Sequence, residues 1–124
     1  MKIYYAHHIW KYGTKIEEYE LNFIKKIFPN AEIFNPSTDI DQTKSEDKIM
    51  KDCFNAVVNS DMVIFSSMNG CIGRGVFREI RFAYQNNIEV KYLFADRIQK
   101  YSKERFEQMS ILNNESQRIY AVVN

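Results

Sequence analysis

The chain has 124 residues, 45% hydrophobic and 27% charged, which is typical of a globular protein and argues against disorder. Its 17 basic and 16 acidic residues leave a formal charge of +1, so we expect no nucleic-acid partner. No apolar run is long enough to cross a bilayer and the N-terminus lacks the pattern of a signal peptide, so we expect no membrane partner and a cytoplasmic location. Residues 1–124 are expected to form a single domain.

The first half of the chain alternates short apolar runs with amphipathic segments. Two capping boxes, Thr14 with Glu17 and Thr43 with Glu46, predict the starts of two helices. Pro29 ends the first helix, because a proline cannot continue it. In chain order, we expect a strand at 2–6, a polar and aromatic loop at 7–13, a helix to 28, a strand at 31–34, a polar loop at 38–45 and a helix to about 59.

The second half is organised around a buried strand that runs through a glycine-rich turn into a helix. Three of the four glycines, Gly70, Gly73 and Gly75, fall in this one turn. Such a connection offers bare N–H groups and a partial positive charge to an anion. In chain order, we expect a strand at 61–65, the glycine turn at 69–75, a helix to 85, a strand at 88–94, a helix at 97–109 and a closing strand at 118–123.

This alternation of strands and helices predicts an α/β fold. We expect a three-layer, doubly wound sheet of about five mostly parallel strands, flavodoxin-like or Rossmann-like, in the order 2-1-3-4-5. Ligands of such sheets bind beyond the carboxyl ends of the strands, where the strand order reverses. That rule brings together three loops, at residues 6–13, 35–40 and 66–75.

Glu79 is the first candidate for chemistry, because it lies about one turn into the helix that follows the glycine turn. It is placed roughly 100° from the centre of the helix's apolar stripe, where a side chain can be shielded and still reach a cleft. The alternative is an ordinary solvated glutamate beside Arg78 or Arg81.

The turn sequence GCIGRG is neither a dinucleotide fingerprint nor a Walker loop. Arg74 at the mouth of the helix would complement a phosphate, and it is equally compatible with a surface arginine. His7 and His8 follow the first strand, where a histidine can bind a phosphate, stack on a base or be an ordinary loop residue. Adjacent histidines diverge and no third ligand is evident, so we expect no metal site.

For two other residues, the orientation of the strand or helix decides whether they reach the site. Tyr4 ends the first strand with Tyr5, and alternation sends the two to opposite faces of the sheet. Asp52 reaches the carboxyl edge only if its helix is suitably rotated. Cys53 and Cys71 are too few for a disulfide framework, and we expect free thiols.

Three segments of the chain resemble the nucleoside 2-deoxyribosyltransferase family, which includes 2'-deoxynucleoside 5'-monophosphate N-glycosidases. They are KIYYAHHI, IMKDCFNAVVNSDMVIF and GVFREIRFAY. The spacing of the last segment places Glu79 on the family's catalytic glutamate, and Tyr4 falls on its first-strand tyrosine. The chain departs from the pattern at His7 and Arg81, where the family has glycine. Asp52 stands one residue before the family's helix aspartate, so that Cys53 occupies that position.

The resemblance implies hydrolysis, or transfer, at the N-glycosidic bond of a nucleoside or nucleoside 5'-monophosphate. Glu79 would be the nucleophile, Tyr4 would orient it, and Asp52 would protonate the leaving base. Groups at the turn and the first loop would hold a 5'-phosphate: Gly73, Arg74 and Gly75, with His7 or His8. The family implies a homodimer or higher homo-oligomer, and no cofactor or metal is expected.

Two other functions remain open at this point. The same fold, lacking the helix aspartate, would serve as a non-catalytic module that binds a nucleotide or an ADP-ribose-like signal. A flavodoxin-like or receiver-like partner protein is a third reading, although the cluster of acidic residues expected after the first strand is missing.

Overall fold

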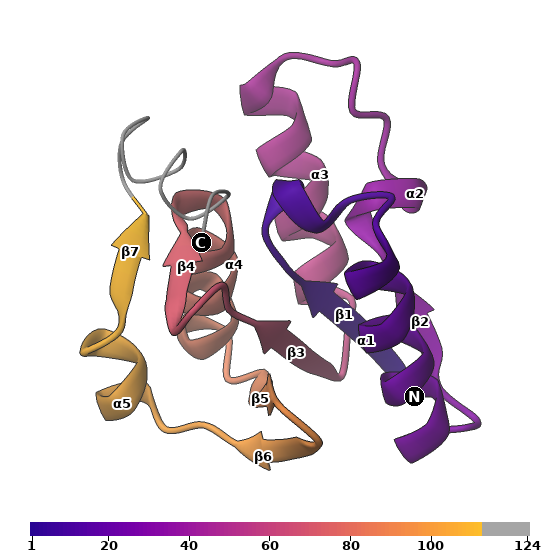
Figure 1. Cartoon of the computed structure of the whole chain (residues 1–124). Coiled ribbons are helices and arrows are strands. Elements are labelled where there is room, and N and C mark those ends of the chain that lie inside the picture. Colours follow the sequence, from indigo (N-terminus) through magenta and orange to yellow (C-terminus); the bar gives the residue numbers. More distant parts are fainter. Residues whose placement is uncertain (113–124) are drawn as a thin grey trace.

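A computed structural model describes residues 1–112 (Figure 1). Its main sheet has five strands in the order β2-β1-β3-β5-β6, all parallel except β6. A second, two-stranded sheet pairs β4 with β7. The strands are β1 (Lys2–Ala6), β2 (Glu32–Phe34), β3 (Met62–Ser66), β4 (Cys71–Gly73), β5 (Glu89–Phe94), β6 (Arg97–Lys100) and β7 (Ser110–Leu112).

The helices connect these strands in the alternating manner that the sequence predicts. They are the 3-10 turn η1 (Ile9–Lys11), α1 (Lys15–Ile27), α2 (Pro36–Asp39), α3 (Glu46–Val58), α4 (Arg74–Gln85) and α5 (Lys103–Glu107). The predicted three-layer α/β sheet in the order 2-1-3-4-5 is therefore confirmed, with β6 in the fifth position. No helix within residues 1–112 has both the length and the apolar character needed to span a bilayer.

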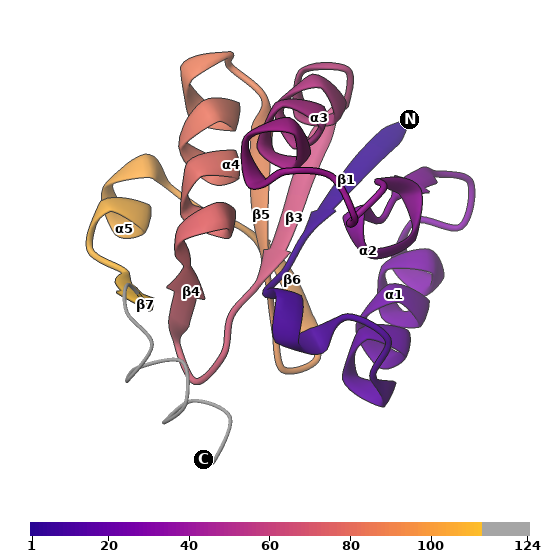
Figure 2. The same cartoon turned by 90° about the horizontal axis from the view of Figure 1, so that it is seen from above.

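Alternating side chains of β1 divide the core between the two faces of the sheet. Tyr4 and Ala6 pack against α3, α4 and α5, whereas Ile3 and Tyr5 pack against α1. Figure 2 shows α4 and α1 on opposite sides of β1 and β3. Both central strands are buried on both faces, which explains why β3 is a continuous apolar run rather than an alternating one.

The predicted helix at 97–109 is wrong in its first half. Ala95 and Asp96 form a two-residue turn, with Ala95 at φ +55°, and the chain returns antiparallel to β5 as β6. Ile98 lies opposite Leu93 and packs on the α1 side of the sheet. A segment this short has too few apolar residues for its spacing to separate a strand from a helix.

Two smaller differences concern the ends of elements. α2 occupies the start of the predicted loop, because Asn35 caps it and Pro36 is its first residue. α5 covers only the middle of the predicted helix and begins after Ser102, which caps it. The predicted closing strand at 118–123 lies outside the described residues.

The cap of α3 is Ser45 and not the predicted Thr43. The Ser45 hydroxyl accepts from the backbone N–H of Lys48 at 3.4 Å. The Thr43 hydroxyl instead donates to the Asp41 carboxylate at 2.6 Å. Thr43 and Ser45 both stand just before the helix and either could cap it. Because the Asp41 carboxylate binds the Thr43 hydroxyl, Ser45 is left to cap the helix.

Replacing Ser45 by alanine should lower the free energy of unfolding by about 1 kcal/mol, because one N–H of the first turn loses its acceptor. The matched variant Thr43→Ala should cost less than half as much. Urea denaturation of both variants measures the difference, and a larger loss for Thr43→Ala would assign the cap to Thr43 after all.

Candidate active site

The loops that follow β1 and β3 meet at the carboxyl edge of the sheet, as expected for a doubly wound fold. In Figures 1 and 2 the turn after β1 lies between α1 and β4. The Lys11 ammonium donates to the backbone carbonyl of Ser67 at 2.9 Å. The His8 ring lies against Gly73 at the start of α4.

Glu79 lies on the buried face of α4 and is only 5% exposed. It is therefore not the solvated glutamate of the alternative reading. The hydroxyl of Tyr4, a wholly buried side chain from β1, donates to its Oε2 atom. Tyr4 also stacks on Phe34, with 5.6 Å between ring centroids. The structure thus brings together two of the three residues that the resemblance places in catalysis.

Burial raises the pKa of Glu79 to about 7, because the carboxylate loses its hydration. Hydrogen bonding by Tyr4 and by the Cys53 thiol opposes this effect without cancelling it. Burial, and then the charge of Glu79, raises the pKa of Tyr4 well above its usual range. Tyr4 therefore keeps its proton at neutral pH and serves as a donor to the carboxylate.

Sequence reasoning missed Cys53 and Tyr12 as neighbours of Glu79. Cys53 comes from the inner face of α3, and burial, followed by the charge of Glu79, raises the pKa of its thiol to about 12. Burial raises the pKa of Tyr12, and the charge of Glu79 is the next cause. The helical spacing of α3 already placed Cys53 inward, and this was the available signal for it. Nothing in the loop sequence indicated Tyr12.

Asp52 does not join this cluster. It is only partly exposed on α3 and forms an ion pair with Lys44 at 3.2 Å. It lines a pocket of about 450 Å³ between α3 and the edge of the sheet, together with Phe34 and Ile40. One residue is a rotation of about 100° on a helix, which is why Cys53 faces Glu79 and Asp52 does not.

His7 and His8 point to different parts of the structure. The Nε2 atom of His7 lies 2.6 Å from Glu17, and its ring stacks on Tyr5 with 3.8 Å between centroids. Burial lowers the pKa of His7 and outweighs the hydrogen bonds to Glu17 and to the Tyr5 carbonyl, which raise it. His8 caps η1, where its Nδ1 atom accepts from the N–H of Trp10 at 3.1 Å.

The glycine turn contains a short strand and then the start of α4. Gly70 has φ +80°, which an L side chain rarely adopts. Gly73 is needed for a different reason, because a Cβ atom there would stand 2.7 Å from Cδ2 of His8. Gly73 is also the N-cap of α4 and makes no side-chain cap. Arg74 and Gly75 follow on the exposed side of the first turn.

The cluster of Glu79, Tyr4, Cys53 and Tyr12 provides one carboxylate that is partly ionised at neutral pH, surrounded by groups that keep their protons. Such a carboxylate can attack an electrophilic carbon or stabilise a developing positive charge. Among residues 1–112, no group of three or more His, Cys, Asp or Glu side chains could hold a metal ion.

Comparisons with known proteins support the fold. No protein-family model matches the chain, and no curated protein matches it in sequence. A solved structure that resembles it is that of the CMP N-glycosidase BcmB from Clostridium botulinum. The two share a TM-score of 0.53 and 15% sequence identity, over 99% of this chain and 97% of that chain. At this identity, the likeness shows a shared fold.

Replacing Glu79 by glutamine should stabilise the protein at alkaline pH. Between the ordinary carboxyl pKa of 4.5 and the folded value of about 7, the unfolded chain releases a proton that the folded chain keeps. The stability of the native protein therefore falls as pH rises through this range. The advantage of Glu79→Gln should grow from near zero below pH ~4.5 to about 3 kcal/mol above pH ~7. Denaturation of both proteins across this range measures it, and a pH-independent difference would refute the raised pKa.

Replacing Gly73 by alanine should displace the His8 ring, because the added methyl group overlaps it. Trp10 is the chain's only tryptophan, its backbone N–H donates to the His8 ring, and the two rings lie 4.7 Å apart between centroids, so its fluorescence should change. Gly75→Ala is the matched control, since nothing lies within 4 Å of a Cβ atom there. The control should leave the fluorescence unchanged and raise helix stability by up to about 1 kcal/mol. Equal spectra for Gly73→Ala and the native protein would contradict the close approach.

Proposed function

We propose that the protein cleaves the N-glycosidic bond of a nucleoside or nucleoside 5'-monophosphate, with Glu79 as the nucleophile. The observation that carries the proposal is a buried carboxylate, held by Tyr4, on the helix that begins at the glycine turn, and this turn follows the carboxyl end of β3, where ligands of this fold bind. The shared fold with a CMP N-glycosidase supports it. Hydrolysis is favoured over transfer to a second base.

In this mechanism, the Glu79 carboxylate attacks the anomeric carbon of the sugar while the bond to the base breaks. The transition state resembles an oxocarbenium ion, which a nearby negative charge stabilises. Water then attacks the glycosyl–enzyme ester, releasing the sugar and restoring the carboxylate. The Tyr4 hydrogen bond fixes the orientation of the carboxylate, which is its role in the proposal.

Among residues 1–112, no side chain beside Glu79 is well suited to donate a proton to the leaving base. Asp52 would have to leave Lys44 and turn across α3 before it could supply that proton. The Cys53 thiol and the Tyr12 hydroxyl are close to Glu79, but both hold their protons too tightly to be strong acids. The proposal therefore rests on Glu79 and Tyr4, and the role of Asp52 is a separate question for mutagenesis.

A 5'-phosphate on the substrate fits the start of α4. The first turn of this helix has no side-chain cap, so its N–H groups are available to an anion. Gly73 and Gly75 contribute backbone, Arg74 contributes an exposed guanidinium, and His8 adjoins Gly73. His7, engaged with Glu17, would act only through the position of the loop. The presence of these groups at the start of α4 favours a nucleoside monophosphate over a nucleoside as the substrate.

The absence of a second carboxylate beside Glu79, within the described part of the chain, favours a second function, in which the site binds a ligand without catalysis. Cys53 faces Glu79 where the resemblance places an aspartate, and Asp52 is turned away toward Lys44. A site with one carboxylate would bind a nucleotide, or an ADP-ribose-like signal, without turnover. Association into a homodimer or larger homo-oligomer remains a prediction for either function, and light scattering of the purified protein measures it.

Incubation with a panel of deoxynucleosides, ribonucleosides and their 5'-monophosphates should release free base, detected by chromatography. The rate should rise with pH through about 7, because the nucleophile must be ionised. Glu79→Gln should lower the rate at least about a hundredfold, whereas Glu18→Gln, an exposed glutamate of α1, should not. Arg74→Ala should raise KM for monophosphates more than for nucleosides.

The outcomes separate the two functions. Tight binding of a panel member without release of base would support the binding module. Neither binding nor release by any panel member would refute the glycosidase, and a failure to bind ADP-ribose as well would refute the binding module. A large loss of rate in Asp52→Asn would restore Asp52 as the acid.

A further inference from the structure

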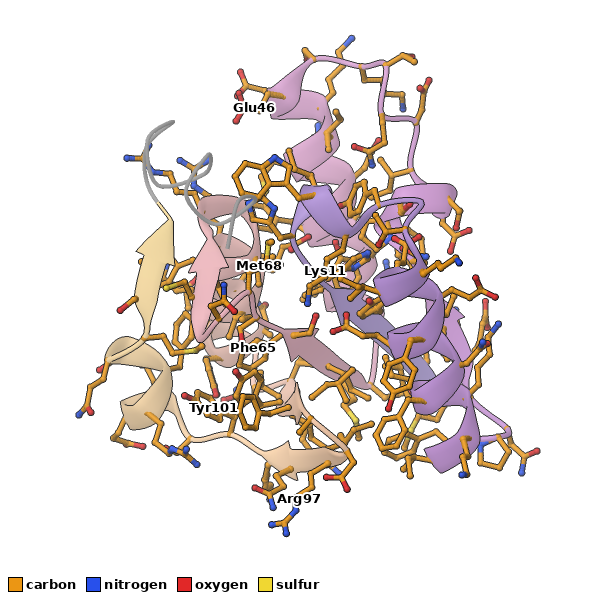
Figure 3. The ribbon with its side chains drawn as sticks, in the orientation of Figure 1. Lys11, Glu46, Phe65, Met68, Arg97 and Tyr101 are labelled. Atoms are coloured by element: carbon orange, nitrogen blue, oxygen red, sulfur yellow. The ribbon has the colours of Figure 1, made fainter. Side chains whose placement is uncertain are left out.

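We propose that Lys11 is a positioning residue that holds residues 7–13, hereafter the cover segment, closed over Glu79. This inference rests on the proposed function for its catalytic consequence, but its structural part can be tested without any activity. Figure 3 labels Lys11, which follows β1 at the carboxyl edge of the sheet.

The cover segment lies across the edge of the sheet and joins its two faces. Tyr12 lies near Glu79 and Cys53, and the His8 ring lies against the start of α4, so both are on the Glu79 side. His7 stacks on Tyr5 and contacts Glu17 of α1, on the opposite side. A displacement of this segment would therefore alter the contacts of its side chains on both faces of the sheet at once.

The side chain of Lys11 fastens the segment to the sheet. Lys11 is only 5% exposed, and its ammonium donates three hydrogen bonds: to Glu20 Oε2 at 3.0 Å, to Ser66 Oγ at 2.9 Å and to the Ser67 carbonyl at 2.9 Å. An ammonium has three donors, and all three are used. A buried cation is tolerated only when it is paired in this way.

Glu20 completes the fastening on the α1 side. Its Oε1 atom accepts from the Tyr5 hydroxyl at 2.5 Å and from the Ser66 hydroxyl at 2.7 Å. Removing the charge of Lys11 would leave this carboxylate beside neutral donors only. The position of Lys11 is therefore set by α1 through Glu20 and by the end of β3 through Ser66, and β1 contributes by holding Glu20 through Tyr5.

The backbone of Lys11 transmits this position to the residues on either side. Its N–H donates to the His8 carbonyl at 2.9 Å, and its carbonyl accepts from the Thr14 N–H at 3.1 Å. Tyr12 follows directly, and its N–H donates to the Ile9 carbonyl at 3.0 Å. Fixing Lys11 therefore fixes His8 and Tyr12, the two side chains that the segment places on the Glu79 side.

Access to Glu79 makes this position important for the reaction. The carboxylate is 5% exposed, so a sugar reaches it only after neighbouring groups move. The cover segment is the part of these surroundings that lies at the strand ends, where substrates of this fold enter. We infer that it opens to admit substrate, and that the three hydrogen bonds of Lys11 return it to the closed position, which keeps bulk solvent away from Glu79 while its carboxylate attacks the sugar.

The test compares Lys11→Met, which keeps the length of the side chain and removes its charge, with Lys11→Arg, which keeps the charge. Lys25→Met, an exposed lysine of α1, is the matched control. Trp10 lies inside the cover segment and is the only tryptophan, so quenching of its fluorescence by acrylamide reports opening. Quenching should increase at least about twofold in Lys11→Met, less in Lys11→Arg and not at all in Lys25→Met.

The catalytic readout should separate positioning from general destabilisation. In Lys11→Met, kcat should fall about tenfold or more while KM changes little, and Lys11→Arg should recover part of the loss. The midpoint of the pH profile should move below 7. Opening lets water reach the Glu79 carboxylate, which is otherwise surrounded by Tyr4, Cys53 and Tyr12, and hydration lowers the pKa that burial had raised.

Several results would overturn the proposal. Unchanged quenching in a folded Lys11→Met protein would show that the segment stays closed without the ammonium. If Lys11→Met does not fold, Glu20→Gln weakens the same cluster, and unchanged quenching in that folded variant would refute the proposal equally. If the native protein releases no base, the proposed function fails, while the quenching experiment still decides the role of Lys11.

Discussion

The hydrogen bond between Tyr4 and Glu79 is the interaction on which the rest of the site depends. It joins the centre of the sheet to α4 inside the larger core cluster, where a carboxylate would otherwise have no donor from β1. Burying this carboxylate costs stability, because its ionised form loses water that one phenol and one thiol only partly replace. An uncharged residue at this position would give a more stable protein. The cost is understandable if the carboxylate is kept for chemistry, since strained or destabilising groups concentrate at functional sites.

Two neighbouring tyrosines organise both faces of the sheet in the same way. Strand alternation directs Tyr4 toward α4 and Tyr5 toward α1, and each hydroxyl donates to a glutamate on the helix that it meets. The two carboxylates differ in their surroundings. Glu20 has an ammonium and two hydroxyls for partners, whereas no cation among residues 1–112 lies beside Glu79. The sheet therefore separates a fully paired carboxylate, suited to holding a loop, from a poorly paired one, suited to reaction.

Sequence patterns predicted the sheet order and the position of Glu79 in the helix after the glycine turn, because both depend on local periodicity and on short connections. Patterns failed where a single residue decided the outcome. Ala95 adopts a positive φ that alanine rarely takes, so the hairpin before β6 had no sequence signal. On α3, one position separates Cys53, which faces Glu79, from Asp52, which pairs with Lys44. Lys11 and Tyr12 lie in a loop, where no periodicity indicates direction, and only the fold shows which groups they meet.

The elevated pKa of Cys53 has a consequence for the chemical durability of the molecule. Oxidants and alkylating reagents attack the thiolate, and a buried thiol with a pKa of about 12 forms almost none at physiological pH. The neighbour of Glu79 is thus shielded from peroxide even though it is a cysteine. Cys71, half-buried in the turn before α4, is the sulfur that reagents meet more readily. Modification there would disturb the pairing of β4 with β7 and would leave Glu79 itself unmodified.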